Sequence, residues 1–83
     1  MLDNINNLEI TQLNIAEVEI KGTCKLNHKY YSVICSVDGI NAWYNGAYIQ
    51  NAMPELSVDQ REFLISGISP EGWKEYFGED FDE

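Results

Sequence analysis

The side chains in this sequence that could do chemistry are one histidine, two cysteines and a few pairs of carboxylates. Because His28 is the only histidine, any Ser–His–Asp or Cys–His arrangement must use it. His28 lies four residues after Cys24 in the lysine-rich segment KGTCKLNH, and the two side chains could hold a metal ion as a bidentate pair. A structural zinc site needs four ligands. We therefore expect no bound metal and interpret His28 as an exposed turn residue.

The remaining candidates favour structural roles. Cys35 falls on the apolar face of a predicted strand, which is typical of a small core residue. A Cys24–Cys35 disulfide would require the two residues to face each other across a hairpin, and a cytosolic setting disfavours it. Glu71 and Glu75 have the i, i+4 spacing of an acid–base pair on a helix, but a solvated helix face is the simpler interpretation. The sequence predicts a protein without catalysis, cofactor or metal.

Two C-terminal helices are the clearest of the elements that must position these side chains. Ser57 and the glutamine three residues after it form a capping-box pattern, and Gly67 can end the helix that they begin. Ser69 can cap a second helix, in which Pro70 occupies the first position and its missing N–H costs nothing. We therefore expect a helical hairpin over residues 57–78.

The segment before and within the first of these helices carries a pattern of spaced residues: Trp43-x-x-Gly46-x-x-Ile49-Gln50-x-Ala52-x-Pro54-x-Leu56-Ser57, then Arg61-Glu62-x-Leu64-x-Ser66-Gly67-Ile68. This pattern resembles a family of small, uncharacterised tailed-phage proteins. Many members look like zinc ribbons, with a Cys-x-x-Cys pair in the N-terminal half and an Ile-Cys-Pro-x-Cys-Trp segment near the end. The corresponding positions here are Cys24, Asn27, Ser69 and Gly72. The resemblance implies a phage origin and a degenerate zinc-ribbon-like scaffold, and it supplies no activity.

The N-terminal half predicts β-structure. Residues 1–7 are polar, and we expect a loose end there. Leu8–Ile20 alternates between apolar and polar residues but changes phase, which predicts either one long strand with a bulge near Asn14 or two short strands. Lys21–His28 is a predicted turn. Lys29–Val37 is the clearest strand, and a connection this short predicts an antiparallel hairpin.

The segment between the strands and the helices allows two interpretations. One is a short helix over residues 40–45, capped by Asp38 and stopped by Gly46. The other is a hairpin with Asn45-Gly46 as a type I′ turn. We favour the helix. A further helical turn over residues 51–53 should close before Pro54.

The expected fold is α+β, with an N-terminal antiparallel β-hairpin packed on a C-terminal helical hairpin. A chain of 83 residues predicts a single domain, residues 1–83, with residues 1–7 and 79–83 as loose ends. The expected core consists of Ile20, Val33, Cys35, Val37, Ile49, Leu56, Phe63, Leu64, Ile68, Trp73 and Phe77.

The charge balance restricts the class of partner. The chain carries 14 acidic and 5 basic side chains, a formal net charge of −9. Such a chain disfavours direct binding to nucleic acid or to an anionic membrane, because both require Lys and Arg. It favours basic protein surfaces, including those that hold nucleic acid. No apolar run approaches the length of a membrane span, and two cysteines without a signal peptide predict a cytosolic protein.

Acidic and aromatic residues alternate near the C-terminus. The candidate partner-binding residues are Glu71, Trp73, Glu75, Tyr76, Glu79, Asp80, Phe81 and Asp82. Carboxylates can stand for phosphates and rings for bases, so such a segment can imitate a nucleic-acid strand. The alternatives are that the acidic ends only keep the chain soluble and that Phe81 folds back over the last helix.

These observations predict a small, acidic, phage-encoded binding protein that inhibits or modulates a host protein in the host cytoplasm. The expected partner has a basic, nucleic-acid-handling surface, such as a defence nuclease, a CRISPR effector or RNA polymerase. A rival hypothesis is a structural or assembly protein that forms a homodimer through the strand edge at Leu8–Ile20. A third is a degenerate zinc ribbon that binds DNA through Lys21, Lys25 and Lys29, and the excess of acids makes it the weakest.

Overall fold

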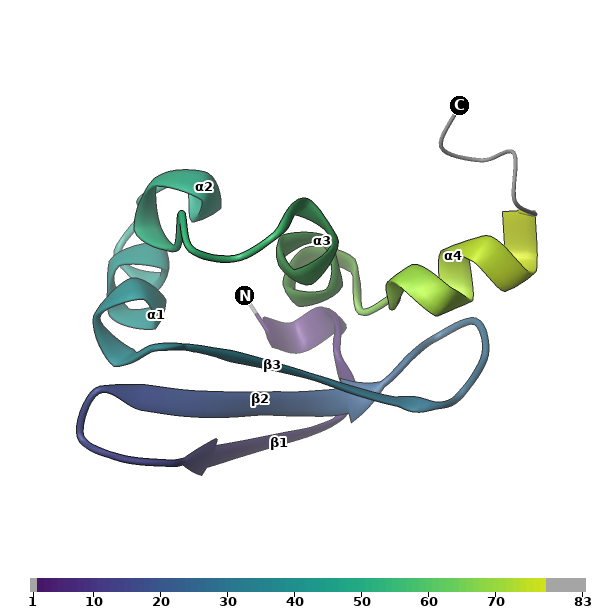
Figure 1. Ribbon diagram of the computed structural model, residues 1–83, viewed down its shortest axis with the longest axis horizontal. Helices are drawn as coiled ribbons and strands as arrows, with labels where there is room; N and C mark the ends of the chain where they lie inside the picture. The colour runs from purple at the N-terminus through teal and green to yellow at the C-terminus, as the bar shows by residue number, and fades with distance from the viewer. Residues whose placement is uncertain (1, 78–83) are drawn as a thin grey trace.

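The computed structural model describes residues 2–77 as one sheet with helices on one of its faces (Figure 1). The elements in chain order are a 3-10 helix η1 (Leu2–Asn4), strands β1 (Asn6–Gln12), β2 (Glu17–Thr23) and β3 (Tyr30–Ser36), and helices α1 (Val37–Tyr44), α2 (Ile49–Ala52), α3 (Val58–Ser66) and α4 (Pro70–Phe77). The strands are antiparallel and lie in the order β1-β2-β3. The expected α+β class is confirmed, with three strands in the N-terminal sheet where two were expected.

The first two strands come from the segment in which the apolar pattern changes phase. β1 and β2 are separated by a turn in which the Asn14 side-chain oxygen accepts a hydrogen bond from the Ala16 N–H at 2.8 Å. The interpretation as two short strands is therefore correct, although β1 begins before Leu8 and β2 continues to Thr23. The expected turn over residues 21–28 starts too early. Gly22 belongs to the sheet, where the Ile5 side chain comes so close that a β-carbon would overlap with it.

The helices cover β2 and β3 but leave β1 open. Ile10 pairs with Ile20, and Ile20 pairs with Val33, so the three side chains form one row on the same face of the sheet. Ile20 and Val33 are 0% and 1% exposed, whereas Ile10 is 54% exposed. All seven residues of β1 are exposed. The hydrophobic core therefore lies under the second and third strands.

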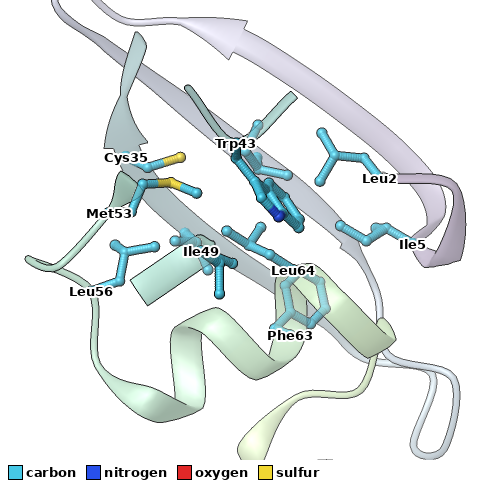
Figure 2. Close-up of a cluster of buried hydrophobic side chains, with 11 residues drawn as sticks. Leu2, Ile5, Cys35, Trp43, Ile49, Met53, Leu56, Phe63 and Leu64 are labelled. Atoms are coloured by element: carbon cyan, nitrogen blue, oxygen red, sulfur yellow. The ribbon is translucent and has the colours of Figure 1, made fainter. Parts of the chain in front are cut away.

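Figure 2 shows the core side chains that meet between the sheet and the helices. Seven of the expected core residues are buried: Ile20, Val33, Cys35, Ile49, Leu56, Phe63 and Leu64. Val37, Ile68 and Trp73 are only partly buried, and Phe77 is exposed. Buried residues that the sequence did not indicate are Leu2, Ile5, Cys24, Trp43 and Met53. α4 extends beyond the end of the sheet (Figure 1).

The expectation of a loose N-terminus over residues 1–7 is wrong for the described residues 2–7. η1 brings Leu2 and Ile5 into the core, beside Trp43 and the end of α3 (Figure 2). The Asn4 side chain donates a hydrogen bond to the Ile65 carbonyl at 2.8 Å and fixes this segment to α3. A small domain buries only a modest apolar area, and Leu2 and Ile5 contribute part of that area.

Local signals set the ends of the helices. Residues 37–44 are helical, so the helix interpretation is correct, but the cap is Ser36 and not Asp38: the Ser36 hydroxyl accepts from the Gly39 N–H at 2.9 Å. At α3 the Ser57–Gln60 capping box forms, and Gly67 ends the helix with φ of 80°. α4 does not fold back along α3 in Figure 1, so a closely packed helical hairpin is not evident.

Candidate functional site

The start of α4 is fixed against the β2–β3 turn. The Ser69 hydroxyl accepts a hydrogen bond from the Gly72 N–H at 3.0 Å, which is the expected cap, and Pro70 begins the helix. The Ser69 N–H donates to the Sγ of Cys24 at 3.4 Å. Gly72 lies so close to this sulfur that a β-carbon would overlap with it. These contacts orient α4, although the helix extends beyond the sheet.

A groove lies between α3 and α4. It has a volume of about 350 Å³ and is lined by Val58, Asp59, Glu62 and Trp73. Asp59 and Glu62 are one turn apart on α3, and within residues 2–77 neither carboxylate makes a hydrogen bond or an ion pair. The negative charge of Asp59 also contributes, after burial, to a raised pKa of the Tyr31 hydroxyl. The groove therefore combines an apolar surface with two carboxylates available to a cation.

The aromatic side chains of α4 form a small cluster next to this groove. Trp73 and Phe77 are stacked, with ring centroids 4.9 Å apart and planes inclined by 24°. Tyr76 meets Phe77 edge to face, also at 4.9 Å. Tyr76 and Phe77 are exposed, while Trp73 is partly buried. The cluster is thus an apolar surface patch, of the composition that protein interfaces favour.

Glu75 faces the other side of α4, towards the β2–β3 turn. Its carboxylate lies 3.7 Å from Lys29 Nζ and 3.4 Å from the Asn27 side-chain amide nitrogen, which donates a hydrogen bond to it. Asn27 and Glu75, together with Leu26, Gly72 and Tyr76, line a hollow of about 180 Å³. Both members of the ion pair are more than half exposed, so the pair contributes little to stability. Because Lys29 neutralises its charge, Glu75 does not add to the acidic surface that the sequence analysis predicted.

The expected partner-binding residues divide into three groups. Trp73 and Tyr76 lie in one surface patch, and Glu71 is exposed on the same helix. Glu75 is paired with a lysine. The others lie outside the described residues: Glu79, Asp80, Phe81 and Asp82. The sequence analysis missed Asp59 and Glu62 as site residues, although their i, i+3 spacing on a well-capped helix placed both carboxylates on one face.

The positions that the resemblance aligns with metal ligands also lie together. Cys24 contacts both Ser69 and Gly72, and its sulfur accepts a hydrogen bond from the Leu26 N–H at 3.4 Å. Their donors are one thiol, one hydroxyl and, at Asn27, one carboxamide, with no side-chain donor at Gly72. Zinc prefers four thiolate or imidazole ligands, so these residues do not fit it.

Hydrogen bonds stabilise the Cys24 sulfur. Burial raises the pKa of the thiol. Hydrogen bonds from the Asn27 and Leu26 backbones and from Ser69 outweigh that effect and bring the pKa below its ordinary value. Cys24 is fully buried and was not among the core residues expected from the sequence. Neither cysteine forms a disulfide, and across residues 2–77 no three His, Cys, Asp or Glu side chains are placed to share a metal ion.

Two of the three lysines proposed for DNA binding, Lys21 and Lys29, are engaged with acids or rings. Lys21 lies 3.9 Å from a Glu9 carboxylate oxygen and 5.4 Å from the centre of the Tyr30 ring. Lys29 pairs with Glu75, as described above. His28 is exposed, as expected, and has a positive φ of 63°. Phosphate binding at these lysines would compete with the contacts that they already make.

Comparisons with protein families, with curated proteins and with solved structures found no match to this chain. Within the described residues, no helix has the length and apolar character of a membrane span.

Proposed function

We propose that this protein is a binding module that recognises a basic surface of another protein through the α3–α4 groove. The observation that carries the proposal is that Trp73 shares one groove with the unpaired carboxylates of Asp59 and Glu62. A lysine or arginine side chain fits such a site, because its alkyl stem can lie on the ring while its charged end meets the carboxylates. The volume of about 350 Å³ is at the lower end of the range for ligand pockets.

The exposed rings beside the groove extend this surface. Tyr76 and Phe77 would supply apolar contact area around the recognised cation. The net charge of −9 would accelerate association with a basic partner and make binding sensitive to salt. Among basic surfaces we favour those that handle nucleic acid, which would give the protein an inhibitory role against a nuclease, a CRISPR effector or RNA polymerase. A phage origin and action in the host cytoplasm are part of the same proposal.

A peptide titration tests the recognition step. An arginine-containing peptide is added to the protein, and backbone amide chemical shifts are followed by NMR at low salt. We expect the largest changes around residues 58–62 and at Trp73, and a loss of these changes in Asp59→Lys/Glu62→Lys. The matched control is Glu17→Lys/Asp38→Lys, which changes the net charge equally at two exposed carboxylates outside the groove, at the start of β2 and in α1. Equal effects of the two double variants would show that only net charge matters and would refute the groove.

A capture experiment tests the biological role. The wild-type chain and both double variants are used as bait in host lysate at low and high salt, and captured proteins are identified by mass spectrometry. We expect a nucleic-acid-binding protein that is released by salt, is displaced by DNA or RNA, and is retained by the control variant but not by the groove variant. A partner that ignores both salt and the groove substitutions would contradict the proposal.

A further inference from the structure

The second surface of interest is the open edge of the sheet at β1. β1 hydrogen-bonds to β2 on one side, and no strand among residues 2–77 pairs with its other side. Between Glu9 and Gln12 the pairing with β2 is regular, and the one irregularity lies before it, between Asn6 and Glu9. Natural edge strands are commonly protected by charged side chains, especially lysine, by proline or by a bulge in the strand. Residues 9–12 contain no lysine, proline or bulge, and Glu9 is their only charged side chain.

The side chains of β1 also lack the helix cover that side chains of β2 and β3 have on the same face of the sheet. Ile10 lies on the helix-covered face, level with Ile20 and Val33, but is 54% exposed. Leu8, two residues before Ile10, is exposed as well. The face that forms the core under β2 and β3 therefore continues, uncovered, on β1.

We propose that β1 pairs with β1 of a second copy of this chain, antiparallel, to form one continuous six-stranded sheet. The two-fold axis would be perpendicular to the sheet and would pass beside Ile10. A two-fold interface of this kind brings the same surface from both copies together. It also keeps both helix layers on the same side of the joined sheet. The proposal does not rest on the function of the α3–α4 groove.

The distribution of charge on β1 is compatible with pairing to a second copy and favours one register. Although the chain has a net charge of −9, β1 contains a single charged residue, Glu9. A register centred on Ile10 places Ile10 opposite the partner's Ile10, and Glu9 opposite the partner's Thr11. The two Glu9 carboxylates then do not face each other, which avoids the cost of like charges directly across a strand pair. Each Glu9 keeps its own Lys21 at 3.9 Å.

Pairing in this register would complete both the hydrogen bonding and the packing of the strand. Free N–H and C=O groups along β1 would gain partners, as they do when a strand is added to a sheet edge. The two Ile10 side chains would contact each other on the helix side, with each Leu8 opposite the partner's Gln12. The dimer would also carry two α3–α4 grooves, so that a partner with repeated basic sites would be held by both.

Sedimentation measurements over a range of protein concentrations test the dimer. We expect reversible dimerisation of the wild type and its loss in Ile10→Lys, because two ammonium groups would meet at the two-fold axis. The matched control is Ile34→Lys: Ile34 is 49% exposed, close to the 54% of Ile10, but lies on the opposite face of the sheet on β3. Thermal unfolding confirms that both variants fold. A wild type that stays monomeric at every concentration, or a dimer that Ile34→Lys disrupts equally, would overturn the proposal.

Cross-linking tests the register. Residues directly opposite each other in an antiparallel pair have β-carbons about 4.5–5.5 Å apart, which is near the range that a disulfide can bridge. Under mild oxidation we expect Ile10→Cys to give a covalent dimer and Thr11→Cys to give much less, since position 11 faces Glu9. The native thiols of Cys24 and Cys35 are buried and present in both variants, so they contribute the same background of cross-linking to each. Faster cross-linking at position 11 than at position 10 would exclude a register centred on Ile10.

Discussion

The Ser69 N–H donates a hydrogen bond to the Sγ of Cys24 at 3.4 Å, across 45 residues of sequence. This contact joins the β2–β3 turn to the first turn of α4, and both residues are buried. It explains how a helix that extends past the sheet is held in one orientation. That orientation places Trp73 beside α3, so the contact also shapes the proposed binding groove.

Replacement of Cys24 should therefore lower the free energy of unfolding, and it should do so most when the new side chain cannot accept a hydrogen bond. Cys24→Ala leaves the Ser69 and Leu26 N–H groups without their acceptor in a buried site, and we expect a loss of about 1–3 kcal/mol in unfolding free energy. Cys24→Ser keeps an acceptor and should lose less. Urea unfolding measures both. If alanine proves as stable as serine, the hydrogen bonds to the sulfur do not stabilise α4.

Gly72→Ala should destabilise the protein through a steric conflict with the same sulfur. The added methyl group would overlap with Cys24 Sγ, and overpacking of this kind costs about 1–3 kcal/mol. In a Cys24→Ala background the sulfur is gone, so the same substitution should be close to neutral. A double-mutant cycle measures this coupling. Additive effects of the two substitutions would mean that α4 shifts to accommodate the methyl group.

Stability should fall between about pH 9 and pH 11 because of Cys35. Burial, with a smaller effect from Glu55, raises the pKa of the Cys35 thiol from 9.0 to about 11. The unfolded chain therefore loses this proton at lower pH than the folded chain, and rising pH favours unfolding. The expected loss is on the order of 2 kcal/mol, at about 1.4 kcal/mol per pKa unit.

The pH effect can be isolated with Cys35→Ala, which removes the titrating group. Unfolding free energies of both proteins are compared at several pH values between 8 and 11. Tyr31 also has a raised pKa in the folded state, but both proteins contain it, so its contribution cancels in the comparison. Parallel pH profiles for the two proteins would show that Cys35 titrates normally in the folded state.

The N-terminal segment should be essential for stability. Leu2→Ala and Ile5→Ala each remove a buried side chain from the core, and each should cost about 2–5 kcal/mol of unfolding free energy. Ile15→Ala is the control: Ile15 is 93% exposed, so its truncation should change stability by less than about 0.5 kcal/mol. Equal denaturation midpoints for the three variants would mean that the first residues do not pack as described.

The sequence alone was sufficient for features that depend on contacts between near neighbours. The capping box at Ser57, the left-handed end at Gly67 and the Ser69 cap before Pro70 each involve groups within four residues of one another. The alternation along residues 30–36 likewise predicted which side chains of β3 face the core, because successive residues of a strand point to opposite faces. Local chemistry therefore predicted the helices of the C-terminal half and the clearest strand.

Only the tertiary structure decided which apolar residues are covered and which polar residues meet. Ile10 and Ile20 are the same residue type and lie side by side on one face of the sheet, yet only Ile20 is buried. The reason is that the helices lie over β2 and not over β1. Similarly, Asp59 and Trp73 share a groove because α4 is held against the β2–β3 turn at Cys24. Burial and site geometry depend on contacts between residues far apart in the chain, and neither hydrophobic periodicity nor capping signals contain that information.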